Sequence, residues 1–161
     1  MDEPKRQARN AQRLGDCRPA FAARLARTIL RWEDGGLRPR TQDAWHAIEH
    51  RVIAFNTGHA QVTFGFHNVT GLAGQKASLA ADLLDDTAAL KPGAPHIPRL
   101  AAAARTEGLD TDVPWGLPAA LRAGTDAAGD FKAPAKVRPQ PRHVEPTGIA
   151  IEEAMAGKLP T

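Results

Sequence analysis

The stretch FGFHNVTGLAGQKASLAADLL, residues 64–84, carries the signals that decide the fold. Its first residues complete the segment 61–66, where apolar residues alternate with polar or small ones, as in a half-buried strand. A turn-rich segment follows, and Asp82 then lies inside the apolar run 79–84. This pattern alone leaves the run open between a helical turn and a buried strand. In either case the carboxylate needs a partner, because an unpaired charge is costly to remove from water.

Helical patterns lie on both sides of this stretch. Apolar residues at helical spacing predict a helix over residues 19–32, which Asp34, Gly35 and Gly36 end. Thr41 is predicted to be the N-cap of a second helix, with Trp45 on its apolar stripe. Further helices are predicted at residues 98–107 and 149–156, and further strands at 113–116 and 143–145. The predicted fold class is therefore α+β.

Length and composition limit the possible classes of protein. The 161 residues suit one domain, and the hydrophobic fraction of 42% is enough for an ordinary core. The net charge is +3 and the basic residues are scattered, so we expect no nucleic acid partner. Cys17 is the single cysteine, which excludes an intrachain disulfide and favours an inert, part-buried thiol.

The N-terminal residues 1–16 are polar and basic and lack the apolar core of a secretory signal peptide. No apolar run approaches the length that spans a bilayer. We therefore expect a monomer that is made in the cytoplasm without a signal peptide and does not insert into a membrane. A substrate in the cell wall would be reached only after release or export.

The first candidate constellation is His46-Ala47-Ile48-Glu49-His50. Residues four apart share one face of a helix, so both imidazoles could bind one metal. The five residues also match the H-x-x-E-H pattern of a zinc-binding motif. The simpler interpretation is a solvated helix face opposite Trp45, because five residues of this pattern arise easily by chance. The simpler interpretation is favoured.

The second candidate is dispersed along the chain. His67 follows the predicted strand 61–66, Asp82 lies in the apolar run, and His143 follows a proline-rich segment. Two imidazole nitrogens and one carboxylate oxygen make an open zinc site with a position left for water. From spacing alone the alternative stays open, since a core histidine or an ion-paired aspartate would explain each residue separately.

Several segments, in order, resemble the zinc D-alanyl-D-alanine carboxypeptidase and L-alanyl-D-glutamate endopeptidase family, which has the Hedgehog/DD-peptidase fold. Residues 64–71 and 79–84 are similar to its S-x-H-x-x-G-x-A-x-D pattern, and residues 143–146 to its H-x-E pattern. Residues 44–58 are similar to its A-W-R-S helix, and residues 115–118 to its W-G-L segment. The match runs from about residue 38 to residue 146.

The resemblance implies that His67, Asp82 and His143 are zinc ligands and that the run 79–84 is a strand. It implies a small single domain in which a short antiparallel sheet carries the zinc site between flanking helices. Glu145 would orient a ligand imidazole. Residues 1–16 would then be a lead-in to a peptidase-like zinc domain at 17–161, and the substrate would be a peptidoglycan stem peptide.

Three departures from the family pattern are visible. The gap from His67 to Asp82 is 15 positions, longer than usual, and the turn-rich segment between them can absorb the excess. Gln140 stands where the family has its acidic general base, and the loss of such a base typically costs roughly 10²–10⁴ in rate. His46 stands where the family has an arginine that stabilises the developing oxyanion.

These departures leave three hypotheses. In the first, the chain is a zinc peptidase, for example a phage-type lysis or virion enzyme, with Glu49, Glu145 or His46 taking over proton transfer. In the second, it is a degenerate peptidase that keeps zinc for folding or for binding a wall peptide or protein. In the third, it binds no metal and is a mostly helical interaction protein. The first is favoured, because an open His₂Asp zinc site keeps Lewis-acid power even without its best base.

Overall fold

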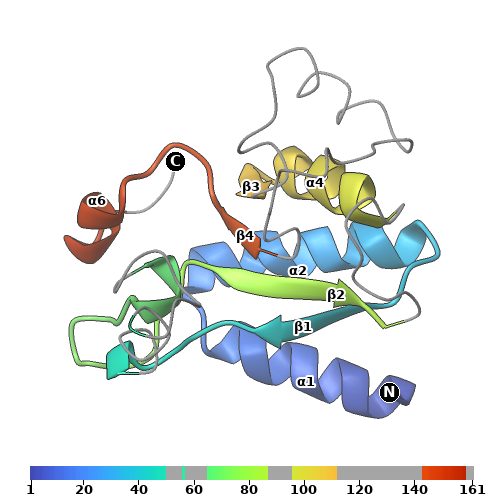
Figure 1. Cartoon of the computed structure of the whole chain (residues 1–161), viewed down its shortest axis with the longest axis horizontal. Coiled ribbons are helices and arrows are strands. Elements are labelled where there is room, and N and C mark those ends of the chain that lie inside the picture. The colour runs from blue at the N-terminus through green and yellow to red at the C-terminus, as the bar shows by residue number, and fades with distance from the viewer. Residues whose placement is uncertain (50–55, 57–64, 87–95, 112–142, 159–161) are drawn as a thin grey trace.

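The computed structural model describes residues 1–49, 56, 65–86, 96–111 and 143–158. It confirms the α+β class, with helices around one four-stranded sheet (Figure 1). The described helices are α1 (Glu3–Gly15), α2 (Pro19–Asp34), α4 (His96–Thr106), α6 (Ile151–Met155) and the 3-10 turn η1 (Phe66–Asn68). The strands are β1 (Pro39–Asp43), β2 (Ala81–Asp85), β3 (Leu109–Thr111) and β4 (His143–Pro146).

The strands pair antiparallel in the order β1-β2-β4-β3, so β2 and β4 are the inner strands. The register places Asp82 of β2 opposite His143 of β4. On its other side β2 pairs with β1, where Thr41 lies opposite Leu83 but Asp43 lies opposite Asp82. Two residues of β1 therefore advance against one of β2, which makes Gln42 the extra residue of a bulge.

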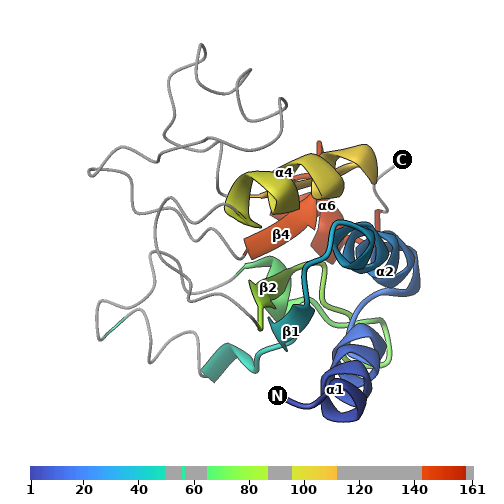
Figure 2. The same ribbon diagram turned by 90° about the vertical axis from the view of Figure 1, so that its right-hand side faces the viewer.

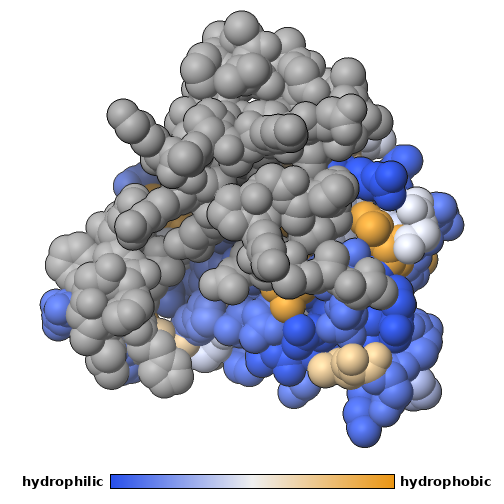
Figure 3. Space-filling view, turned by 45° about the vertical axis from the view of Figure 1, so that its right-hand side comes forward, coloured by the Kyte–Doolittle hydropathy of each residue, from blue (hydrophilic) through white to orange (hydrophobic). Residues whose placement is uncertain are grey.

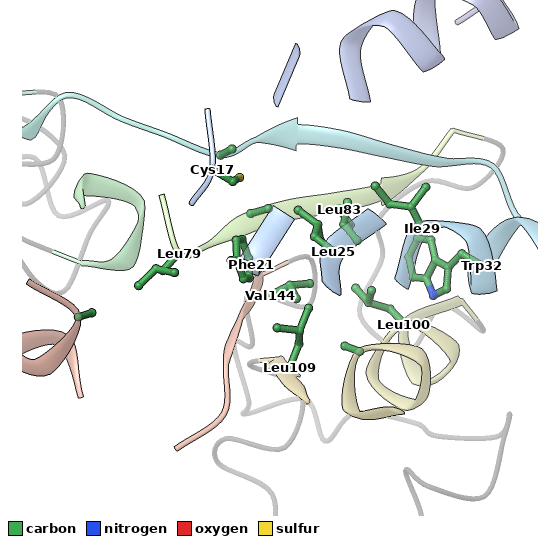
Figure 4. Packing of buried hydrophobic residues seen from close by; sticks show 14 residues of the cluster. Cys17, Phe21, Leu25, Ile29, Trp32, Leu79, Leu83, Leu100, Leu109 and Val144 are labelled. Atoms are coloured by element: carbon green, nitrogen blue, oxygen red, sulfur yellow. The ribbon is translucent and has the colours of Figure 1, made fainter. Parts of the chain in front are cut away.

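The hydrophobic core lies between α2, the sheet and α4 (Figure 4). Phe21, Leu25, Ile29 and Trp32 follow one another at helical spacing and are buried on one side of α2. They meet the inner strands and α4 in a cluster completed mainly by Leu79, Leu83, Leu100, Leu109 and Val144. Full burial of a large apolar side chain contributes about 1.5–3 kcal/mol, so this cluster is the main force that holds β2 and β4 in place.

Several predicted elements are confirmed. The helix expected at residues 19–32 is α2, and the helices expected at 98–107 and 149–156 are α4 and α6. The ambiguous run 79–84 contributes strand β2, and residues 143–145 belong to β4. Gly108, expected to end the helix, has φ +69, a conformation that favours glycine.

The prediction that Thr41 caps a helix is wrong. Thr41 lies in β1 and is fully buried, its amide donates to Asn10 Oδ1 at 2.7 Å, and it pairs with Leu83. Tertiary pairing therefore overrides a local preference for the N-cap position. Helical residues begin only at Ile48.

The predicted strand at residues 61–66 is wrong at its last two positions, Gly65 and Phe66. Phe66 opens the turn η1, which closes because Asn68 N donates to Gly65 O and Gly65 N donates to Asn68 Oδ1, both at 2.9 Å. Residues 61–64 and the predicted strand 113–116 lie outside the described residues.

Helix α1 lies along the outer edge of β1 (Figure 2). Asp2 caps it, accepting from Lys5 N at 3.0 Å, and Arg6 and Asn10 are its buried residues. The polar segment 1–16 is thus a helix joined to the sheet by polar side chains, while its predicted division from a domain at 17–161 stays a prediction.

Cys17 follows α1 and is buried, and burial raises the pKa of its thiol to about 12. Such a thiol carries almost no thiolate at neutral pH, which agrees with the expected inert cysteine.

On the face shown in Figure 3, the described surface is mostly polar. Among the described residues, the large exposed apolar side chains, such as Leu30, Ile48 and Leu72, lie far apart in the sequence. Within the described ranges, no helix has the length and hydropathy needed to cross a membrane.

Candidate metal centre

A backbone carbonyl in the segment that follows β1 fixes the orientation of His67. It lies in η1, is only 5% exposed, and its Nδ1 donates a hydrogen bond to the carbonyl oxygen of Ala44. Ser78 Oγ also lies 3.0 Å from this carbonyl, although its shortest contact to a carbonyl is 2.7 Å, to Ala80 O. Because a carbonyl can only accept, the neutral His67 ring carries its proton on Nδ1 and presents the lone pair of Nε2.

His143 reaches the same place from β4. Its Nε2 lies 3.0 Å from Oε2 of Glu145, two residues further along the strand. An ionised carboxylate also only accepts, so the neutral His143 ring carries its proton on Nε2 and presents the lone pair of Nδ1. The side chains of His143 and Glu145 are 12% and 18% exposed, so this contact is largely shielded from water.

Asp82 completes the cluster from the strand between them. Its Oδ1 lies 3.5 Å from His143 Nδ1 and 3.7 Å from His67 Nε2, and the two ring nitrogens are 3.2 Å apart. One ligand atom from each residue can be chosen so that all lie within 4.8 Å of one another. The structure therefore brings together the three residues that the sequence singled out.

The spacing suits a metal ion. Ligand bonds of about 2.0–2.2 Å in a tetrahedral zinc site place neighbouring ligand atoms about 3.3 Å apart, close to the observed 3.2–3.7 Å. The chemistry suits it too, because two lone pairs and a carboxylate converge and attract a positive charge. That charge can be a proton shared by the imidazoles or a metal ion. The cluster can therefore hold a divalent metal.

The electrostatics of Asp82 agree with a centre of this kind. Burial acts to raise the pKa of Asp82, but hydrogen bonds from His143 and His67 outweigh burial and hold the pKa far below its ordinary value; a proton shared by the two facing ring nitrogens then takes the place of the cation. The carboxylate is therefore charged at all ordinary pH values and available to a cation.

His46 lies beside the centre but outside the cluster. Its ring centroid is 4.9 Å from that of His67, its amide donates to His67 O at 3.0 Å, and its Nε2 is 3.7 Å from Asp43 Oδ2. His46 precedes the helical residues, which begin at Ile48, so the helical face required by the H-x-x-E-H interpretation is not formed at its first residue. Glu49 is exposed.

Two of the predicted positions cannot be placed. Gln140 and His50 lie outside the described residues. The sequence, in turn, gave no sign of the groups beside His67: the Ala44 carbonyl that its ring contacts, and Ser78 next to that carbonyl. A backbone carbonyl leaves no trace in the side-chain pattern, so spacing could not have revealed it.

Comparisons with known proteins identify the fold. No family model matches the chain, and no curated protein matches it. Among solved structures, the chain is similar to a bacterial peptidase: the L-Ala D-Glu endopeptidase ChiX of Serratia marcescens. The TM-score is 0.55, the identity is 15%, and the match covers 87% of this chain and 87% of that chain. The resemblance indicated by the motifs is therefore confirmed for the fold.

Proposed function

We propose that the chain is a zinc-dependent peptidase that cleaves peptide bonds in the stem peptides of peptidoglycan. The observation that carries the proposal is the convergence of His67 Nε2, His143 Nδ1 and Asp82 Oδ1 at 3.2–3.7 Å. The fold shared with an L-Ala D-Glu endopeptidase supports the same reaction class. The finer proposal of a phage-type lysis or virion enzyme, acting on the wall after release or export, rests on the sequence resemblance.

The proposed roles follow from the contacts. His67, Asp82 and His143 would hold the ion, while the Ala44 carbonyl and Glu145 fix the two rings. A zinc ion held by three protein ligands supplies Lewis-acid polarisation of the scissile carbonyl and lowers the pKa of water. His46, beside His67, would donate a hydrogen bond to the developing oxyanion, although one imidazole lacks the bidentate fork of arginine.

Proton transfer is the weak step in this proposal. Gln140 occupies the position of the expected base, and an amide cannot accept a proton from water near neutral pH. Glu145 is engaged with His143 at 3.0 Å, so it serves best as an orienting carboxylate. We therefore expect slow hydrolysis compared with enzymes that carry a carboxylate at this position.

Digestion of purified peptidoglycan tests the proposal. The protein is incubated with zinc, with chelator, and with a peptidase of known activity as positive control, and released muropeptides are identified by mass. Zinc-dependent release of cleaved stem peptides is the expected result. No cleavage, with the control active, would remove the catalytic proposal.

The second candidate function is a zinc-holding binding module on the same fold. Gln140 and His46 favour it, because both depart from residues that catalysis needs. The double variant Gln140→Asp, His46→Arg separates the two candidates. Activity that appears only in this variant would identify the natural chain as the binding module, whereas activity in the natural chain identifies the enzyme.

A further inference from the structure

The bulge in β1 is the feature that leads from the N-terminal helix to the proposed metal centre. Gln42 is its extra residue, and immediately after it Asp43 lies opposite the candidate ligand Asp82. A bulge bends its strand and re-aims the residues that follow it, and bulges are frequent beside active sites. Here the next residue is Ala44, whose carbonyl holds His67. The shape of the bulge thus decides where that carbonyl lies.

Arg9 of α1 binds this bulge from the outer edge of the sheet. Its Nε donates to Thr41 O at 3.0 Å and its Nη2 donates to Gln42 O. The two carbonyls flank the irregular step in the register, where the regular ladder is disrupted. One planar guanidinium with donors in a fixed fork therefore sets the relative position of the two peptide units.

The regular part of β1 has its own support. Asn10 donates to Pro39 O at 3.1 Å and accepts from Thr41 N at 2.7 Å, and Arg6 also donates to Pro39 O. These contacts, like the pairing of Pro39 with Asp85, do not involve Arg9. Loss of the Arg9 side chain should therefore leave the strand paired and free only the bulge.

We infer that Arg9 is a positioning residue of the metal centre, acting through the bulge and the Ala44 carbonyl on the orientation of His67. The inference rests on the proposed function, because it takes the cluster to hold zinc. It assigns to α1, which the sequence placed outside the peptidase-like domain, a part in shaping the site.

Zinc affinity provides the test, with a matched control. Arg18 also donates from its guanidinium to two carbonyls, Lys158 O and Ala154 O, each at 3.2 Å, but these belong to the C-terminal segment. Zinc dissociation constants of the full-length chain, Arg9→Ala, Arg9→Lys and Arg18→Ala are measured by competition with a chromophoric chelator. Loss of a group that contacts a ligand typically costs 10–100-fold in affinity, so one step further out we expect about 3–10-fold for Arg9→Ala.

The zinc dissociation constant of Arg9→Lys should lie between those of the natural chain and Arg9→Ala, because an ammonium group lacks the planar fork of a guanidinium. Arg18→Ala should leave the dissociation constant unchanged. The visible absorption of the cobalt-loaded protein, which reports ligand geometry, should change in Arg9→Ala, less in Arg9→Lys, and not in Arg18→Ala. Equal dissociation constants for Arg9→Ala and Arg18→Ala would overturn the inference. If Arg9→Ala does not fold, an Arg9→Lys variant with the natural dissociation constant overturns it. A natural chain that binds no zinc would remove the proposed function as well, whereas normal binding in every variant removes this inference alone.

Discussion

The two imidazoles of the candidate centre are held from opposite sides and in different ways. His143 is held by Glu145, a carboxylate two residues along its own strand, at 3.0 Å. His67 is held by the carbonyl oxygen of Ala44, 23 positions earlier in the chain. One ring is therefore oriented by a side chain within its own strand, and the other by the path of a distant backbone segment.

This difference determines how the support of each imidazole can be lost. The His143 side depends on one charged side chain, so a single substitution removes its support. The His67 side depends on a peptide group that no substitution at Ala44 itself removes, so its support is lost only if the segment from β1 moves. Ser78, whose hydroxyl lies 3.0 Å from the same carbonyl, and the contacts of α1 with β1 oppose that movement.

Asp82 belongs to neither side, and its loss should give the largest effect. Asp82→Asn keeps the shape but removes the charge that a divalent ion requires, so we expect zinc affinity to fall by more than about 100-fold, the upper end for changes outside the ligand set. Asp85→Asn is the matched control. Asp85 is also buried on β2 and accepts from Arg38 N at 3.2 Å, away from the cluster. Equal zinc affinity in the two variants would contradict the assignment of Asp82.

Removal of the side-chain support should give the next largest effect. Glu145→Ala leaves His143 without its acceptor, and we expect zinc affinity to fall about 10–100-fold. Glu145→Gln keeps an acceptor without the charge and should fall between. Asp110→Asn serves as control, since Asp110 lies opposite Glu145 in the register and its carboxylate accepts from the amide of its neighbour Thr111 at 2.8 Å. If Asp110→Asn lost as much zinc affinity as Glu145→Ala, the loss would come from removing negative charge from the strands and not from releasing the His143 ring.

Weakening the backbone support should show mainly in stability. Ser78 is fully buried, its hydroxyl lies within hydrogen-bond distance of the carbonyls of Ala44 and Ala80, and its Oγ accepts from Ala80 N at 3.1 Å. Ser78→Ala leaves that buried amide without its acceptor, which costs about 1–3 kcal/mol in the free energy of unfolding. Urea denaturation of the metal-free protein measures it.

The control for Ser78 is Thr28→Val. Thr28 is also fully buried, but its hydroxyl bonds Arg24 O within α2, where the helix already pairs that carbonyl. We expect a smaller loss of stability than in Ser78→Ala. If Ser78→Ala and Thr28→Val lose the same free energy of unfolding, the Ser78 hydroxyl contributes no more than a hydroxyl within a helix, and its assigned role beside His67 is wrong.

The same difference explains how much of the site could be predicted from the sequence. His67, Asp82, His143 and Glu145 are chemically distinctive side chains in a motif order, and the structure brings all four together. Ala44 and Arg9 act through backbone carbonyls, and neither residue type nor spacing reveals which carbonyl a side chain will meet. The sequence thus predicted the His143 side of the centre and missed the support of the His67 side.

The fold shows the same limit. Helix α2, with its strong periodicity, was predicted correctly from the pattern, whereas the pattern left the run 79–84 open and only the family resemblance implied the strand that the structure has there, β2. Strand β1 reads PRTQD and has no apolar alternation, because its edge is satisfied by Asn10 and Arg9 of α1 and not by packing. Thr41 was therefore assigned to a helix cap, since only the paired tertiary structure distinguishes the two environments.

The smallest effect is expected at Glu107, which lies outside the candidate metal centre. It also tests whether zinc affinity depends on the stability of the whole fold. Glu107, after α4, is bound by Arg27 and Arg31 of α2, and these hydrogen bonds lower the pKa of its carboxyl below the ordinary value of 4.5. A lowered pKa in the folded state means that the stabilisation is fully present above pH 4.5 and is lost as the pH falls through the folded value. Glu107→Gln should therefore be slightly less stable than the natural chain at pH 7 and equally stable in strong acid. Thermal unfolding across this pH range measures the difference.

Zinc affinity at pH 7 should stay unchanged in Glu107→Gln, because Glu107 contacts neither His67 nor His143. A change in zinc affinity would show that the overall stability of the fold, and not the two local supports, governs the site.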